Sequence, residues 1–96
     1  MAKFRLADAA RRDLEDIWDY IAEDNPSAAD SFIAMLIEKC QLLAREPEIG
    51  RDRPEIKTGL KSLPVERYVI FYRVMDRMVE IARVLSGYRD ITKLFH

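Results

Sequence analysis

Side chains suited to acid–base or nucleophilic chemistry are few in this sequence. The single histidine is the last residue, His96, and the single cysteine is Cys40. A general base must be held in a fixed geometry, which a chain terminus rarely provides. Cys40 lies on an apolar stripe expected to be helical, where a thiol packs as a small hydrophobic group. We therefore predict no catalytic residue and interpret Cys40 as structural.

Patterns for metal or phosphate binding are also missing from the sequence. Gly50, Gly59 and Gly87 are scattered, so no glycine-rich phosphate loop exists. Acidic side chains of the first predicted helix fall largely outside its apolar stripe, and no histidine accompanies them, so we expect a solvated face. They are Asp13, Asp16, Asp19 and Glu23. The sequence predicts neither a metal nor a cofactor.

Basic side chains in the second half are the remaining candidates. Residues 1–50 carry six basic and eleven acidic side chains, a net charge of −5, whereas residues 51–96 carry ten and six, a net charge of +4. Guanidinium and ammonium groups bind phosphates or the carboxylates of a protein partner. Two interpretations stay open: two surfaces with different partners, or solvated faces and salt bridges to the acidic helices. The candidates among them, on the predicted loop, strands and tail, are Arg51, Arg53, Lys57, Lys61, Arg67, Arg73, Arg83, Arg89 and Lys93.

Two amphipathic helices are predicted to follow a short N-terminal strand at residues 3–7. The first helix is expected to be capped by Asp8. Its apolar positions recur at helical spacing and are widened by Trp18. They are Ala10, Leu14, Ile17 and Ile21. The second helix is predicted to begin with Asn25 as cap and Pro26 in first position, with Ser27 as the alternative cap, and to end before Pro47.

The second half predicts a long loop and then a β-meander. Residues 46–59 are predicted to form the loop. Residues 60–65 are predicted to form a weak strand, in which Pro64 marks an edge or a bulge, and residues 68–74 and 78–85 a hairpin around Asp76-Arg77. A two-residue loop places Arg73 opposite Glu80.

Both faces of this predicted hairpin are largely apolar, whereas a sheet with one wet face should alternate cleanly. We expect the helical hairpin on one face. The other face is expected to be partly covered by the C-terminal tail, by another chain, or by both. One face holds Tyr68, Ile70, Tyr72, Val74, Val79, Ile81, Arg83 and Leu85; the other holds Val69, Phe71, Arg73, Met75, Met78, Glu80, Ala82 and Val84.

The length and composition fit one folded domain spanning residues 1–96. Hydrophobic residues make up 49% of the 96 positions and charged residues 34%. No signal peptide and no membrane-spanning run is predicted, and a lone cysteine suits a reducing compartment, so we expect a cytoplasmic protein. The predicted fold is α+β, with an N-terminal strand and an α-helical hairpin packed on a C-terminal antiparallel β-meander.

In their order along the chain, these pieces resemble the RelE/ParE superfamily of bacterial toxins, and the ParE branch in particular. The resemblance covers nearly the whole sequence. It is carried by residues 10–21 (ARRDLEDIWDYI), 47–55 (PEIGRDRPE), 59–64 (GLKSLP), 68–73 (YVIFYR), 79–81 (VEI), 83–85 (RVL) and 87–90 (GYRD).

The resemblance implies a toxin of a type II toxin–antitoxin system, with the plasmid-stabilising role of such pairs. It implies a ParD-like antitoxin that forms a hetero-oligomer with the toxin and folds along a groove on it. We place that groove on the second sheet face. Its predicted residues are Val69, Phe71, Arg73, Met75, Met78 and Ala82.

Two targets follow from the resemblance: DNA gyrase for ParE-type toxins and mRNA on the ribosome for RelE-type toxins. Arg89 falls at a position resembling a RelE catalytic arginine, but Phe95 stands where the proton-transferring tyrosine would be. The chain is also slightly acidic, with a pI near 5.8, unlike most RNA-binding domains. We therefore predict gyrase inhibition without catalysis, no sequence-specific nucleic-acid binding, and keep mRNA cleavage or an inactive toxin as alternatives. The predicted target contacts are Arg51, Arg53, Arg83, Arg89, Leu94 and Phe95.

Overall fold

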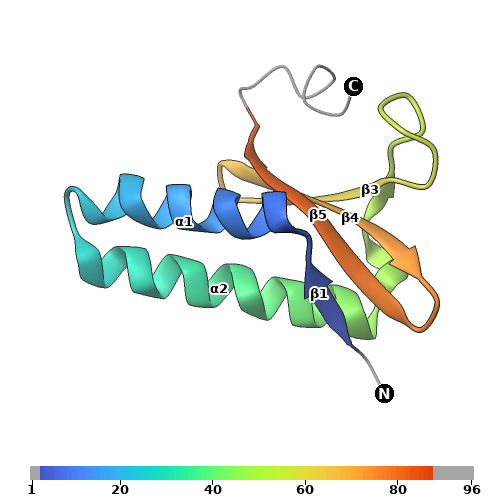
Figure 1. The fold of residues 1–96 in the computed structure, drawn as a ribbon, viewed down its shortest axis with the longest axis horizontal. Helices are drawn as coiled ribbons and strands as arrows, with labels where there is room; N and C mark the ends of the chain where they lie inside the picture. Colours follow the sequence, from blue (N-terminus) through green and yellow to red (C-terminus); the bar gives the residue numbers. More distant parts are fainter. Residues whose placement is uncertain (1–2, 88–96) are drawn as a thin grey trace.

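The computed structural model describes residues 3–87 (Figure 1). The predictions made for Arg89, Leu94, Phe95 and His96 therefore lie outside the described residues. The elements in chain order are β1 (Phe4–Leu6), α1 (Asp8–Ala22), α2 (Pro26–Arg45), the 3₁₀ turn η1 (Pro47–Ile49), β2 (Arg51–Asp52), β3 (Lys61–Val65), β4 (Tyr68–Met75) and β5 (Met78–Ser86). No helix in the described range is long and apolar enough to cross a membrane.

The helix boundaries agree with the sequence except at one cap. The Asn25 side chain accepts a hydrogen bond from the Ala28 amide at 3.0 Å, and Pro26 takes the first helical position, so the predicted cap of α2 is confirmed. The prediction for Asp8 is wrong: Ala7 precedes α1 without a side-chain cap, and Asp8 is the first helical residue. A carboxylate there still favours the positive end of the helix dipole.

All five strands form one sheet in the order β1-β5-β4-β3-β2. The predicted antiparallel meander of β3, β4 and β5 is confirmed, and β1 adds to it as an edge strand parallel to β5. The predicted loop at residues 46–59 is wrong in its first part, because it contains η1 and the short strand β2, which pairs with β3. The two helices lie side by side against the sheet (Figure 1).

The hairpin register follows the prediction near the turn and departs from it farther away. Arg73 lies opposite Glu80, with Nε and Oε1 3.2 Å apart, as predicted. A bulge then places Phe71 opposite Arg83, so that Ala82 is the extra residue of β5. The face assignments beyond it are therefore wrong, because one added residue reverses every later side chain.

Each sheet face packs against a different layer. On the helix side, Val84 joins a core that includes Leu36, Ile70 and Tyr72, the last three fully buried. On the other face, the loop between β2 and β3 closes over the sheet. A second, smaller cluster forms there from Ile56, Leu60, Phe71, Ala82 and Leu85, with Val69 against it.

This second cluster adds a cover to the far face that the sequence did not predict. The tail, another chain, or both were expected to cover the face in part, and within the described residues the chain's own loop covers its centre. The loop is held by backbone hydrogen bonds from Arg53 to the Leu60 carbonyl (2.8 Å), from Ile56 to Arg53 (3.1 Å) and from Leu60 to Lys57 (3.1 Å). A backbone bonded in this way is ordered, so the centre of that face is sealed.

Tyr72 ties the segment after α2 to the sheet. Its hydroxyl donates to the Pro47 carbonyl (2.8 Å) and accepts from the Gly50 amide (2.9 Å), and burial raises its pKa. Gly50 has an ordinary φ of −77°, so space rather than backbone strain requires a glycine. A Cβ there would overlap the Tyr72 hydroxyl and lie 2.7 Å from two ring carbons.

We predict that Gly50→Ala destabilises the fold by about 1–3 kcal/mol, the usual cost of forcing extra volume into a packed region. Urea unfolding followed by circular dichroism measures this. Gly87→Ala is the matched control, because its Cβ would meet only ordinary contacts of 3.6 Å or more, and it should change stability by less than about 0.5 kcal/mol. Equal unfolding midpoints for both variants would contradict the account of Tyr72.

Candidate functional site

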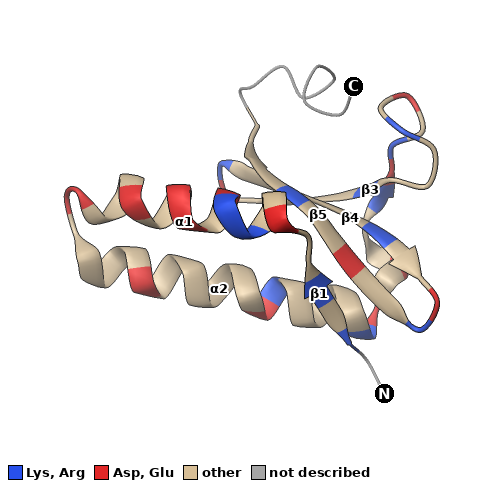
Figure 2. Cartoon of the chain, in the orientation of Figure 1, with Lys and Arg blue, Asp and Glu red and all other residues tan. Residues whose placement is uncertain are grey.

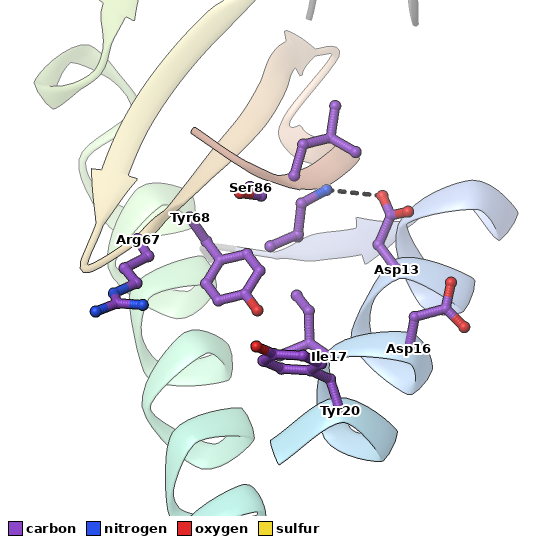
Figure 3. A pocket seen from close by; sticks show the side chains of 9 residues that line it. Asp13, Asp16, Ile17, Tyr20, Arg67, Tyr68 and Ser86 are labelled. Carbon is purple, nitrogen blue, oxygen red and sulfur yellow. Dashed lines mark hydrogen bonds between the residues drawn. The ribbon is translucent and has the colours of Figure 1, made fainter. Parts of the chain in front are cut away.

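Asp13 is buried, which corrects its assignment to a solvated helix face. The residue is 8% exposed and its side chain meets β5 (Figure 3). One carboxylate oxygen accepts from Arg83 Nε at 2.8 Å and the other accepts from Nη2 at 2.9 Å. The first oxygen also accepts from the Val84 amide at 2.9 Å. A single carboxylate thus satisfies both a guanidinium and a backbone donor of the strand.

The role of Asp13 follows from the point at which β1 ends. β1 pairs with residues 79–81 of β5, and the Ala7 amide extends that edge with a 2.9 Å bond to the Ile81 carbonyl. The chain then turns into α1, so no strand is available beside Val84. A buried amide without a partner is costly, and Asp13 supplies the acceptor that a longer β1 would have supplied.

Arg83 is a structural cation in the described part of the chain. The hydrogen bond that Arg83 donates to Asp13 raises the pKa of Arg83, whose side chain is 21% exposed. A guanidinium held by two parallel bonds keeps both its charge and its direction. The predicted role of Arg83 as a target contact is therefore limited to the small part of the side chain that solvent reaches.

The other predicted target residues lie elsewhere on the sheet. Arg51 is exposed on β2, while Arg53 donates to Glu55 at 2.7 Å and to the buried Ser62 hydroxyl at 3.3 Å. The Arg53 hydrogen bond lowers the pKa of Glu55. Since β4 and β3 separate β5 from β2, Arg83 does not join Arg51 and Arg53 in one site.

The six residues predicted for antitoxin binding divide into two groups. Phe71 and Ala82 are 0% and 6% exposed beneath the β2–β3 loop, and Val69 packs beside them. The remaining three stay accessible on strands β4 and β5. These are Arg73, Met75 and Met78.

An apolar hollow lies next to that accessible group, at the turn of the β4–β5 hairpin. Its volume is about 500 Å³, and Val74 and Met75 on its wall are 49% and 38% exposed. The other lining residues are Ala44, Pro47, Arg77, Met78 and Val79. Large exposed apolar side chains gathered at one place are typical of a protein-binding surface.

A larger cavity, which the sequence did not predict, opens beside Asp13. Its volume is about 590 Å³, and it lies between α1, the β3–β4 turn and the end of β5 (Figure 3). The residues around it are Asp13, Asp16, Ile17, Tyr20, Arg67, Tyr68, Val84, Leu85 and Ser86. One signal could have found Asp13: it follows Ala10 by three positions and therefore borders the apolar stripe.

Within residues 3–87, the one thiol is buried in the core, and the acidic side chains do not gather into a metal site. Cys40 is fully buried on α2, and burial raises its pKa to about 12, which confirms its interpretation as a structural thiol. Within residues 3–87, no group of three His, Cys, Asp or Glu residues is placed to hold a metal ion.

We predict that Asp13→Ala destabilises the fold by about 3 kcal/mol, because it leaves the Arg83 guanidinium and the Val84 amide without their acceptor. Asp16→Ala, one turn away and exposed, is the control and should cost less than about 0.5 kcal/mol. Urea unfolding of both variants supplies the measurement. A loss at Asp13 no greater than that at Asp16 would show that the buried pair contributes little.

Comparison with known proteins gives one consistent answer. A family model described as the ParE toxin of the type II toxin–antitoxin system parDE matches residues 4–91. Toxin ParE1 of Caulobacter vibrioides is 33% identical over 86 residues, covering 88% of each chain. Toxin RelE3 of the same organism is 33% identical over 85 residues, covering 88% of this chain and 92% of that protein.

Solved structures show the same fold. The chromosomal ParDE toxin–antitoxin system from P. aeruginosa superposes with a TM-score of 0.76 at 24% identity, covering 90% of this chain and 96% of that one. A chain of the toxin–antitoxin complex RelBE2 from Mycobacterium tuberculosis gives 0.68 at 27% identity, covering 88% and 96%. Since the family match spans nearly the whole described sheet and both helices, this chain belongs to the family of ParE toxins of type II toxin–antitoxin systems.

Proposed function

We propose that this toxin stops growth by binding DNA gyrase, and that a ParD-like antitoxin neutralises it by forming a hetero-oligomer with it. The observation that carries this proposal is that the side chains able to take part in proton transfer are held in structural hydrogen bonds. Arg83 is bound to Asp13, and the Tyr72 hydroxyl is bound on both sides with its pKa raised. These contacts give both groups a structural role, which supports a toxin that acts by binding.

The sequence near the C-terminus also supports gyrase binding over mRNA cleavage. The resemblance to RelE-type toxins places Phe95 where a proton-transferring tyrosine would stand, and a phenyl ring has no exchangeable proton. Binding to gyrase requires only surface complementarity. Arg51 offers an exposed cation on β2, outside the ion pairs that hold Arg53 and Arg83.

A second candidate function is ribosome-dependent mRNA cleavage. It is favoured by the 33% identity to a protein named Toxin RelE3, which equals the identity to a Toxin ParE1 of the same organism. The names of relatives therefore do not separate the two targets, and a direct assay must.

We expect purified toxin to inhibit supercoiling of plasmid DNA by gyrase, and its expression to give filamentous cells with a DNA-damage response. Arg51→Ala should weaken inhibition about tenfold, the effect of losing roughly 1.4 kcal/mol of binding. Arg12→Ala is the matched control, since it removes the same charge from an exposed position on α1.

Three results would count against gyrase as the target. Unimpaired supercoiling together with cleaved mRNA would support the ribonuclease. Unimpaired growth would indicate a toxin that only binds its antitoxin. Equal potency of Arg51→Ala and Arg12→Ala would remove Arg51 from the target surface.

For the antitoxin, we propose the apolar hollow at the hairpin end, which includes Met75 and Met78 of the predicted groove. Coupled folding of an antitoxin segment would bury these side chains. We expect Met75→Asp to weaken binding of a co-expressed ParD-like antitoxin at least tenfold in calorimetric titration. Ala34→Asp places the same charge at an exposed position of α2 and should leave affinity unchanged. Equal affinity of both variants would place the antitoxin elsewhere.

A further inference from the structure

The cavity beside Asp13 is large enough for a ligand group and is not used by either proposed binding surface. Its volume of about 590 Å³ falls in the range of small-molecule and side-chain sites. It lies against α1 and the end of β5, whereas the antitoxin surface lies at the opposite end of β5, by the hairpin turn. Its walls carry charge and aromatic rings rather than aliphatic groups alone.

The free charge of this cavity is negative on the α1 side. Asp13 is neutralised by Arg83, so its carboxylate has no remaining demand for a cation. Asp16, one turn later, is exposed on the rim, and acidic residues continue along α1 (Figure 2). Arg67 borders the cavity from the β3–β4 turn, across from Asp16 (Figure 3). A cation is therefore attracted to the α1 side by Asp16 and repelled from the opposite side by Arg67.

Two tyrosine rings offer surfaces for a cationic group and for the methylene chain that carries it. Tyr68 is half-buried, and its ring is held by Phe32 with centroids 5.6 Å apart and planes at 52°. Tyr20 is 72% exposed on α1 and borders the same cavity. Aromatic faces attract ammonium and especially guanidinium groups, and they pack against methylene stems.

We propose that this cavity receives one basic side chain, an arginine before a lysine, presented by a partner protein. The cation pairs with Asp16, and the stem lies against Tyr20 and Tyr68. Arginine is favoured because its planar guanidinium both stacks on a ring and binds a carboxylate through two donors. The proposal does not depend on whether gyrase or the ribosome is the target.

Titration of the ¹⁵N-labelled full-length toxin with the blocked tripeptide acetyl-Gly-Arg-Gly-amide tests this assignment by NMR. We expect saturable shifts at Asp16, Tyr20 and Tyr68, with a dissociation constant on the order of 1–10 mM, as suits one exposed ion pair with stacking. Asp16→Asn should weaken binding about fivefold or more. Asp19→Asn, which removes an exposed acid of α1 that does not line the cavity, should leave it unchanged.

Four results would overturn the proposal. The first is the absence of saturable shifts, and the second is equal binding of acetyl-Gly-Gln-Gly-amide. The third is equal weakening by Asp16→Asn and Asp19→Asn, with both variants folded by circular dichroism. The fourth is tighter peptide binding by Arg89→Ala, which would mean that this chain's own arginine competes for the cavity and that no partner is needed.

Discussion

The buried carboxylate of Asp13, on the first helix, is the constraint on which the rest of this structure depends. β1 is only three residues long, and the chain leaves the sheet to start α1. Asp13 then returns from the helix to accept from Arg83 and from the Val84 amide. This contact fixes the rotation of α1 on the sheet. Beyond the bulge at Ala82, the Val84 amide therefore has its acceptor on α1 rather than on a strand.

The bulge decides which side chains the toxin can show to a partner. It turns Val84 toward the helices and Leu85 toward the loop, so both sheet faces are filled from within the chain. A partner segment cannot lie along the centre of the far face without displacing Ile56 and Leu60. Two accessible hollows lie at opposite ends of the hairpin: the apolar hollow near Met75 and the charged aromatic cavity near Asp16. The two sites proposed for these hollows are therefore separated by the length of β5.

Local features were predictable from the sequence. The Asn25-Pro26 start of α2 and the two-residue turn at Asp76-Arg77 are each set by neighbours in the chain, and both are confirmed. The ion pair of Arg73 and Glu80 follows from that turn by counting. The burial of Cys40 follows from helical spacing. In all of these, one residue's place is determined by others a few positions away.

The features that escaped prediction depend on residues distant in sequence. The pairing of Asp13 with Arg83 joins positions 70 apart, and nothing in helical periodicity distinguishes a buried acid at the stripe's border from a solvated one. No glycine next to Ala82 indicates a bulge at that position. The closure of the β2–β3 loop over Phe71 requires knowing that β2 pairs with β3, which two charged residues, Arg51 and Asp52, do not suggest. The cavity beside Asp13 could not be predicted for the same reason, because it is formed by α1, β5 and the turn before β4.

Hydrogen exchange at the Val84 amide tests the contact between Asp13 and β5 most directly. With Asp13 as its acceptor, this amide should exchange as slowly as that of Val79, which bonds to the Lys3 carbonyl at 3.0 Å within the sheet edge. In Asp13→Ala, protection should fall at Val84 and persist at Val79. Exchange at Val84 as fast as at the exposed Thr58 in the unaltered protein, with Val79 still protected, would contradict the claim that Asp13 completes the sheet.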